Sequence, residues 1–320
     1  MKKWIALCIA LGSAFPASFL QAQTWPQRPV KVIVSFSAGG NTDTQARIVS
    51  ERLSAALGQQ FIVENRVGAG GAIAAEFVAK APADGYTLFF AAAPQLLIVP
   101  LIQKVNYDPL KDFAPISILG TNPFVLSVHV SVPAKTLNEF IDYVKAHPGE
   151  INYSSGGTGT GAHLTAALFA SRAGLKMTHV PYKGGAQSVT DLVGGQVQMV
   201  FGNASDMIQH SNSGKIRLLA VSGEKRAPQL PDLPAIAELY PGFRSDTWNG
   251  FVAPAATPKQ IIDRVAQEVA KAARDPRIIE RLNKIGVDAL GNTPAEFTTR
   301  IRSEAPLWHD AVNAAGIKQE

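Results

Sequence analysis

The alternation of short β-rich runs with helical stretches is the feature that most constrains how this chain can fold. Residues 30–36 predict a strand, and apolar residues recur at helical spacing over 42–57. Strands follow over 61–64 and 86–91, with a helix over 72–80 between them. This order favours a mostly parallel sheet that helices cover on both faces.

The same alternation of strands and helices starts again near Phe124 and predicts a second unit. Its predicted strands cover residues 125–130, 151–154, 178–180, 197–201 and 216–222, and its helices cover 137–146, 161–173 and a core at 189–193. A segment with Pro228, Pro231 and Pro234 then crosses back. The chain closes with a strand over 248–253 and helices over 259–274, 276–285 and 294–315. We therefore predict an α/β protein with a discontinuous first lobe over 23–123 and 247–320, and a second lobe, including the crossover segment, over 124–246.

Residues 1–22 have the features of a secretory signal peptide. Two lysines precede an apolar run from Trp4 to about Leu20, and the small residue Ala22 stands at a polar boundary. Cleavage there would remove Cys8, the only cysteine, and would lower the formal net charge from +5 to +3 because both lysines leave. A charge of that size without a clustered basic face argues against nucleic-acid binding.

Two strand-to-helix loops, at residues 37–43 and 154–161, are unusually rich in Gly, Ser and Thr. Glycines let the backbone approach a ligand closely, and a helix N-terminus adds about half a positive charge. Either loop alone could be no more than a tight turn. Because one stands in each predicted lobe, at the strand ends where open α/β sheets bind ligands, we expect both to face an anion in the cleft between the lobes.

Nucleotide, metal and catalytic signatures are missing from these loops. Neither loop has the lysine of a phosphate-binding P-loop, and a dinucleotide fingerprint would need a glycine at Ala162 and an acid near Tyr182. The six histidines lack the spacing of a helical metal site, and G-x-S-x-G does not occur. We therefore expect no cofactor and no metal. A hydrolase or transferase that uses the loops as an oxyanion or anion site is the alternative, and turnover of a bound ligand would distinguish it.

Several polar residues in or after the loops allow more than one interpretation. His163 could face a ligand or hydrogen-bond the loop that it follows, and Asp43 could contact a ligand, cap a helix or orient its loop. Asp206, together with Asn203, follows the strand over 197–201 and could line the cleft, or it could be a helix N-cap.

Six segments, taken in order, resemble the signatures of Bug-type solute-binding receptors of the tripartite tricarboxylate transporter family. They cover residues 32–43, 63–71, 84–88, 107–113, 180–185 and 248–254. The resemblance implies a two-lobed periplasmic "Venus flytrap" that is not an enzyme. Such a receptor closes on a small carboxylate and delivers it to a membrane permease pair, and we expect it to be a monomer. A cytosolic effector-binding module of a regulator is a weaker alternative, since residues 1–29 show a signal peptide and a short lead rather than a DNA-binding segment.

In that family the carboxylate is held between the two loops, largely by backbone N–H and hydroxyl groups. The positions expected to bind the ligand here are Gly39, Gly40, Thr42, Asp43, Ser155, Gly157, Thr158, Gly159, Thr160 and His163, with Asn203 and Asp206 toward the ligand's far end. Two departures from the family pattern suggest a particular ligand. Residues 91–95 lack the usual hydroxyls, which favours a less polar or aromatic ligand. Asp206 would repel a second carboxylate, which favours a monocarboxylate or a ligand with a donor group.

Overall fold

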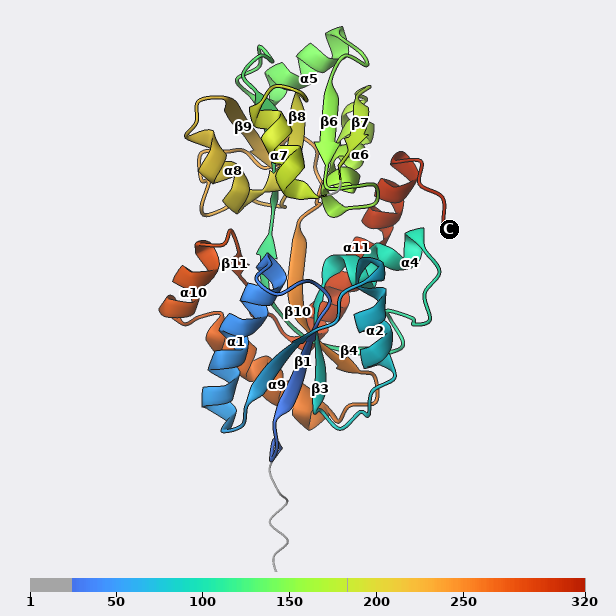
Figure 1. The fold of residues 1–320 in the computed structure, drawn as a ribbon, viewed down its shortest axis with the longest axis vertical. Helices are drawn as coiled ribbons and strands as arrows, with labels where there is room; N and C mark the ends of the chain where they lie inside the picture. The colour runs from blue at the N-terminus through green and yellow to red at the C-terminus, as the bar shows by residue number, and fades with distance from the viewer. Residues whose placement is uncertain (1–24, 183, 320) are drawn as a thin grey trace, which may run out of the picture.

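The computed structural model describes residues 25–182 and 184–319, which form two lobes that each contain one β-sheet (Figure 1). The predicted signal peptide and Cys8 lie outside the described residues. Within the described part of the chain, no helix combines the length and the apolar character needed to cross a bilayer.

The first lobe is built on a six-stranded sheet. In spatial order its strands are β11 (Asp288–Ala289), β4 (Phe113–Asn122), β10 (Thr247–Pro254), β3 (Thr87–Ala92), β1 (Val30–Val34) and β2 (Phe61–Asn65). Strand β1 pairs in parallel with β2 and β3, whereas β10 runs antiparallel to both of its neighbours. Both faces of the sheet are buried, so successive residues such as Val32 and Ile33 belong to separate core clusters on opposite faces.

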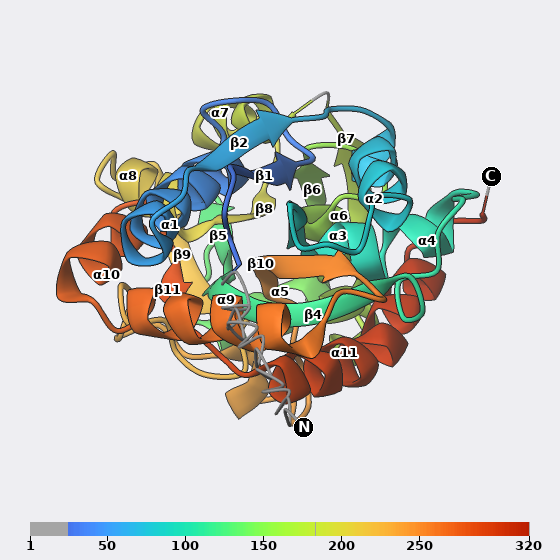
Figure 2. The ribbon, with the colours of Figure 1, turned by 90° about the horizontal axis from the view of Figure 1, so that it is seen from below.

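Helices cover this sheet on both sides (Figure 2). One face packs against α1 (Asn41–Leu57), α9 (Lys259–Ala272) and α10 (Pro276–Asn283). The other face packs against α2 (Ala72–Ala79), α3 (Ala93–Leu97), α4 (Val99–Ile102) and α11 (Pro294–Ala314), and the short helix η1 (Ala69–Gly71) precedes α2.

The second lobe has a five-stranded sheet. Its strands, in spatial order, are β7 (Thr178–Pro181), β6 (Asn152–Ser155), β8 (Met199–Asn203), β5 (Phe124–His129) and β9 (Ile216–Val221). Its helices are α5 (Leu137–Ala146), α6 (Gly161–Ala173), α7 (Gly185–Val193) and α8 (Ala204–Ser211), and the short helix η2 (Ile236–Glu238) lies in the crossover segment.

The predicted α/β fold of two lobes is confirmed, and most strands of each sheet point the same way. The exceptions are β5 and β10, which are the strands next to the lobe crossings, and the two-residue β11. The predicted elements exist, and most of their ends differ by one or two residues. The sequence analysis missed β4, β11, α3, α4 and α8. Pro115 concealed β4, because proline is rare inside a strand; it lies at an irregular step in the β4–β10 register.

The two connections between the lobes lie side by side. Asn122, the last residue of β4, is paired with Thr247, the first residue of β10. On the second-lobe side, the Ser222 hydroxyl accepts a hydrogen bond from the backbone N–H of Phe124 at 2.9 Å and donates one to the carbonyl oxygen of Ser245 at 3.1 Å. We call this pair of connecting strands the hinge.

A buried ion cluster holds the returning strand against α11. Arg300 contacts Asp246 at 2.7 Å and Glu304 at 2.6 Å, and Arg244 contacts Asp246 at 2.9 Å. The Trp248 indole N–H donates to Glu304 at 2.8 Å. Helix α11 also packs on α6 of the second lobe, so this helix contacts both lobes next to the hinge.

Candidate functional site

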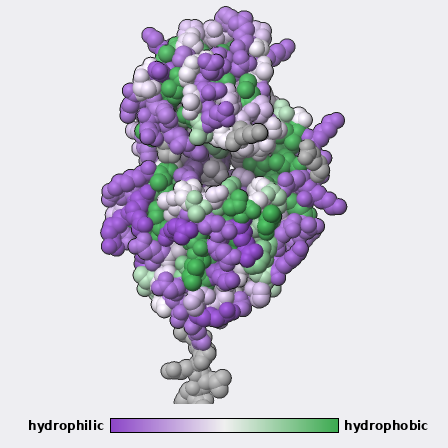
Figure 3. Space-filling model, viewed as in Figure 1, coloured by the Kyte–Doolittle hydropathy of each residue, from purple (hydrophilic) through white to green (hydrophobic). Residues whose placement is uncertain are grey.

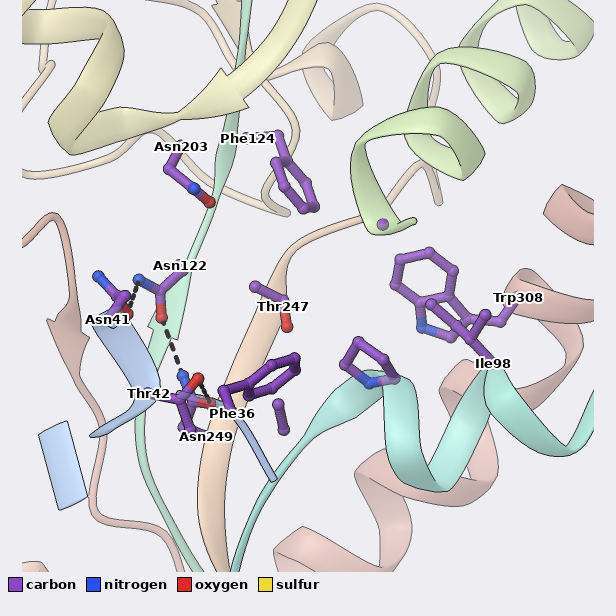
Figure 4. A pocket seen from close by; sticks show the side chains of 13 residues that line it. Phe36, Asn41, Thr42, Ile98, Asn122, Phe124, Asn203, Thr247, Asn249 and Trp308 are labelled. Atoms are coloured by element: carbon purple, nitrogen blue, oxygen red, sulfur yellow. Dashed lines mark hydrogen bonds between the residues drawn. The ribbon is translucent and has the colours of Figure 1, made fainter. Parts of the chain in front are cut away.

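A cavity of about 190 Å³ lies between the lobes, next to the hinge strands. The space-filling view shows the molecule hollowed at this level (Figure 3). Both lobes, the hinge strands and α11 contribute to its wall. The lining residues are Phe36, Asn41, Thr42, Ala92, Pro94, Ile98, Asn122, Phe124, Gly161, Asn203, Thr247, Asn249 and Trp308 (Figure 4). Among these described residues, none carries a formal charge.

The N-terminus of α1 opens onto this cavity. Strand β1 ends at Val34, and Gly39 turns the chain at a φ of +82°, which favours glycine. Gly40 is the N-cap of α1, and no side chain caps the helix there. The first turn of α1, with Asn41 and Thr42 on the cavity wall, therefore presents backbone N–H groups and the positive end of the helix dipole.

Asp43 does not line the cavity; it is buried behind the first loop and orients it. Its carboxylate accepts hydrogen bonds from the Gly39 N–H at 2.9 Å, from Arg47 at 2.9 and 3.0 Å, and from Asn65 at 2.8 Å. Burial alone would raise the pKa of Asp43, but these hydrogen bonds outweigh it and hold the pKa below its usual value. Of the roles considered for Asp43, the structure supports the orientation of the loop.

Side-chain amides fill the end of the cavity beside α1. Asn122 donates to Asn41 at 3.3 Å, and its own oxygen accepts from Asn249 at 3.4 Å. The Thr42 hydroxyl donates to the Asn249 oxygen at 3.1 Å, and Gln45 donates to Asn41 behind the wall. These hydrogen bonds offset the free-energy cost of burying the polar groups and fix the orientation of the side chains.

The opposite end of the cavity is apolar. In Figure 4 the side chains of Ile98 and Trp308 lie across the cavity from the amides, with Phe36 and Phe124 between the two ends. Phe124 also packs on the N-terminus of α6, since a methyl group at Gly161 would lie 3.0 Å from the end of its ring. The cavity therefore has a polar end and an apolar end.

The second Gly-rich loop, at 155–160, is held by its own hydrogen bonds. The Thr160 hydroxyl, at the N-cap of α6, donates to the Gly157 carbonyl at 2.8 Å and accepts from the His163 backbone N–H at 3.4 Å. Ser155 donates to the same carbonyl at 3.0 Å. Gly159 has a φ of +78° and packs toward Ile102 of the first lobe. None of the predicted ligand residues of this loop lines the cavity, which the segment reaches only at Gly161.

His163 accepts a hydrogen bond from the Gly159 N–H at its Nδ1 atom, at 3.1 Å. Its ring is stacked on His179 with centroids 3.7 Å apart, and Tyr153 stacks on His179 in turn. Burial, with a smaller effect from His179, lowers the pKa of His163 to about 4. A neutral imidazole that accepts from the loop agrees with the interpretation in which His163 supports the loop. His163 and the exposed Thr158 line a separate hollow of about 660 Å³ beside the end of α11.

Asn203 and Asp206 lie on the second-lobe side, but only one of them reaches the cavity. Asn203 is the N-cap of α8, its side chain does not cap that helix, and it lines the cavity. Asp206 is exposed in the first turn of α8 and is not on the cavity wall. Of the twelve predicted residues, Thr42 and Asn203 thus meet at one cavity, from opposite lobes.

The sequence analysis missed much of the cavity wall. Asn122 ends β4 and Asn249 lies within β10, and both amides are buried. An amide within a strand is a detectable signal, because a buried amide must be paired. Trp308 lies in the last helix and gave no signal beyond a helical apolar pattern. Among the described residues, no group of three or more His, Cys, Asp or Glu side chains could hold a metal ion.

Comparison with known proteins gives consistent matches along most of the chain. Residues 45–316 match the family described as "Tripartite tricarboxylate transporter family receptor". The chain is 34% identical to Protein BugT of Bordetella pertussis over 313 residues, which span 97% of this chain and 96% of BugT.

Two solved structures from Rhodopseudomonas palustris are similar over the whole of their own length. Rpa4515 with adipate is 35% identical, with a TM-score of 0.79 and coverage of 93% of this chain and 100% of that chain. MatC with bound malate is 31% identical, with a TM-score of 0.73 and coverage of 90% and 100%.

Proposed function

The chain belongs to the receptor family of the tripartite tricarboxylate transporters, and we propose that it captures a small carboxylate in the cavity between its lobes and passes it to a membrane permease of that class. The family is one of substrate-binding receptors and not of enzymes. The adipate and malate bound by the two similar structures support a carboxylate ligand.

The observation that supports the proposal most directly is that the described residues lining the cavity include polar side chains but none with a charge. The N-termini of α1 and α8, with Asn203 at the second, provide dipoles from opposite lobes. Such dipoles stabilise an anion, whereas a lysine or arginine would be left without a partner in the empty cavity.

We assign direct ligand contact to Asn203 and to backbone N–H groups in the first turn of α1, including that of Thr42, whose hydroxyl is engaged with Asn249. Asp43 and Gly39 shape the first loop, and Ser155, Gly157, Gly159, Thr160 and His163 shape the second. Lobe closure about the hinge would bring these two loops toward the ligand. In this proposal the lobes divide at 123/124 and 246/247, and the N-terminal signal-peptide features support export to the periplasm.

Calorimetric titration of the mature protein tests this function. The panel contains monocarboxylates, dicarboxylates and the amide of each acid. We expect at least one carboxylate to bind while its amide does not, and we expect the ligand to be recovered unchanged after incubation, as NMR would show. Binding of amides as tight as that of the acids, or consumption of the ligand, would contradict the receptor function.

A further inference from the structure

We propose that the ligand is a monocarboxylate that carries a single aromatic ring, with its carboxylate at the first turn of α1 and its ring toward Trp308. This inference rests on the proposed function and specifies the class of carboxylate. The evidence for it is that one end of the cavity is polar and the other is apolar (Figure 4).

The polar end suits one carboxylate. Asn41 and Thr42 belong to the uncapped first turn of α1, and Asn203 stands at the N-cap of α8 without capping it. The amide of Asn249, 3% exposed, is fixed by Thr42 and Asn122. All of these groups are neutral, so they can bind a single anion through N–H dipoles without a permanent counter-charge.

The apolar end suits a ring. Pro94 and Ile98 of the first lobe and Trp308 of α11 form its wall. Trp308 is 3% exposed and Ile98 is 1% exposed, so both side chains are held in place by packing. Phe36 and Phe124 lie between this wall and the amides, which gives a ring aromatic neighbours along its length (Figure 4).

A second carboxylate has no suitable partner at the apolar end. The wall there contains no cation among the described residues, and its indole N–H is a neutral donor. The ring of Phe124 lies against Gly161 at the nearby N-terminus of α6. A charged group there would lose its hydration without compensation.

The cavity has room for about one ring. Its volume of about 190 Å³ is below the ~300 Å³ at which pockets for drug-sized ligands begin. A flat, six-membered ring with one carboxylate fits both this volume and the polarity of the two ends.

Titration of the mature wild-type protein with benzoate, terephthalate, adipate and benzamide tests the inference. We expect benzoate to bind at least tenfold more tightly than terephthalate and adipate, and benzamide not to bind. Tighter binding of either dicarboxylate would overturn the monocarboxylate inference while leaving the proposed function intact. If none of the three carboxylates binds, the inference fails, and the wider panel above decides the proposed function. If benzamide binds as well as benzoate, the proposed function itself fails.

A charge placed at the apolar end provides a second test. Pro94 is only partly buried and lies in the first turn of α3, so Pro94→Arg can place a guanidinium near the ring end. We expect this variant to raise the affinity for terephthalate relative to benzoate at least tenfold. The matched variant Pro94→Gln adds length without charge, and we expect its affinity for terephthalate relative to benzoate to stay at least tenfold below that of Pro94→Arg. An unchanged ratio in Pro94→Arg, in a protein with wild-type circular dichroism, would mean that the ring end lies elsewhere.

Discussion

The hydroxyl of Thr42 donates a hydrogen bond to the side-chain oxygen of Asn249 at 3.1 Å, across 207 positions of sequence. This contact joins the first turn of α1 to β10, the strand that returns from the second lobe. It also directs the Asn249 amide nitrogen away from Thr42 and toward Asn122. The loop that faces the proposed ligand is therefore fixed to the hinge.

Removal of this hydroxyl should weaken ligand binding without unfolding the protein. A hydrogen bond of this kind contributes about 0.5–1.5 kcal/mol to holding the first turn of α1 in its binding position, so Thr42→Val should lower affinity by up to roughly 12-fold in a calorimetric titration. Thr42→Ser keeps the donor and should stay close to the wild type. Equal affinities for all three proteins would mean that the Thr42–Asn249 contact does not contribute to ligand binding.

The buried carboxylate of Asp43 should stabilise the fold most at neutral pH. Asp43→Asn loses charge-assisted hydrogen bonds from Gly39 and Arg47 and should cost roughly 1.5–3 kcal/mol of unfolding free energy in urea titrations. Because the pKa of Asp43 is lowered in the folded state, its contribution is complete above the usual value of 3.8 and is lost as the pH falls through the lower, folded-state pKa. The difference between wild type and variant should therefore shrink in acid. A difference that grows below pH 4 would contradict this assignment.

His163 should make the second loop sensitive to acid. Its pKa falls from 6.5 to about 4 on folding, so between these values the unfolded chain binds more protons and stability declines as the pH drops. At 1.36 kcal/mol per unit of pKa, the loss is roughly 3 kcal/mol between pH 6.5 and pH 4. His163→Gln should show a flatter profile over this range in denaturant unfolding. An equally steep profile in the variant would assign the effect to other groups.

Thr158 distinguishes the two accounts of the second loop. The resemblance to the receptor family predicts a ligand contact, whereas the structure places the exposed Thr158 on the hollow beside α11. We expect Thr158→Val to bind the ligand within about twofold of the wild type, because surface substitutions away from a site have small effects. A tenfold loss of ligand affinity in this variant would show that Thr158 belongs to the binding site.

Much of the fold could be predicted because the strands and helices obey their own periodicities. The two loops were visible for a local reason: glycines such as Gly39 and Gly159 occupy left-handed conformations at strand-to-helix turns. What local sequence does not contain is the direction in which a loop faces. In the second loop, the hydroxyls of Ser155 and Thr160 donate to the Gly157 carbonyl of the same loop and so do not point into the cavity.

The cavity wall could be predicted only in part, because it depends on long-range pairing. Asn122 and Asn249 approach each other through the β4–β10 ladder, 127 positions apart in sequence. Trp308 reaches the cavity because α11 runs along the hinge, and its apolar spacing on that helix is the same as that of core residues such as Ile301. An amide within an apolar strand is the one local signal that would have identified Asn249.

A matched pair of charge changes on one helix tests the central claim most directly. Asn203 lines the cavity and Asp206 does not, although both belong to the start of α8. Asparagine and aspartate serve equally well as N-caps, so Asn203→Asp should fold normally. Two like charges about 4 Å apart repel by roughly 1 kcal/mol in water and by roughly 4 kcal/mol near a protein surface. Calorimetry with the best-bound carboxylate should therefore show at least a fivefold loss of affinity for Asn203→Asp. Asp206→Asn should change affinity by less than twofold. Unchanged affinity in Asn203→Asp would contradict the account that a carboxylate binds in this cavity.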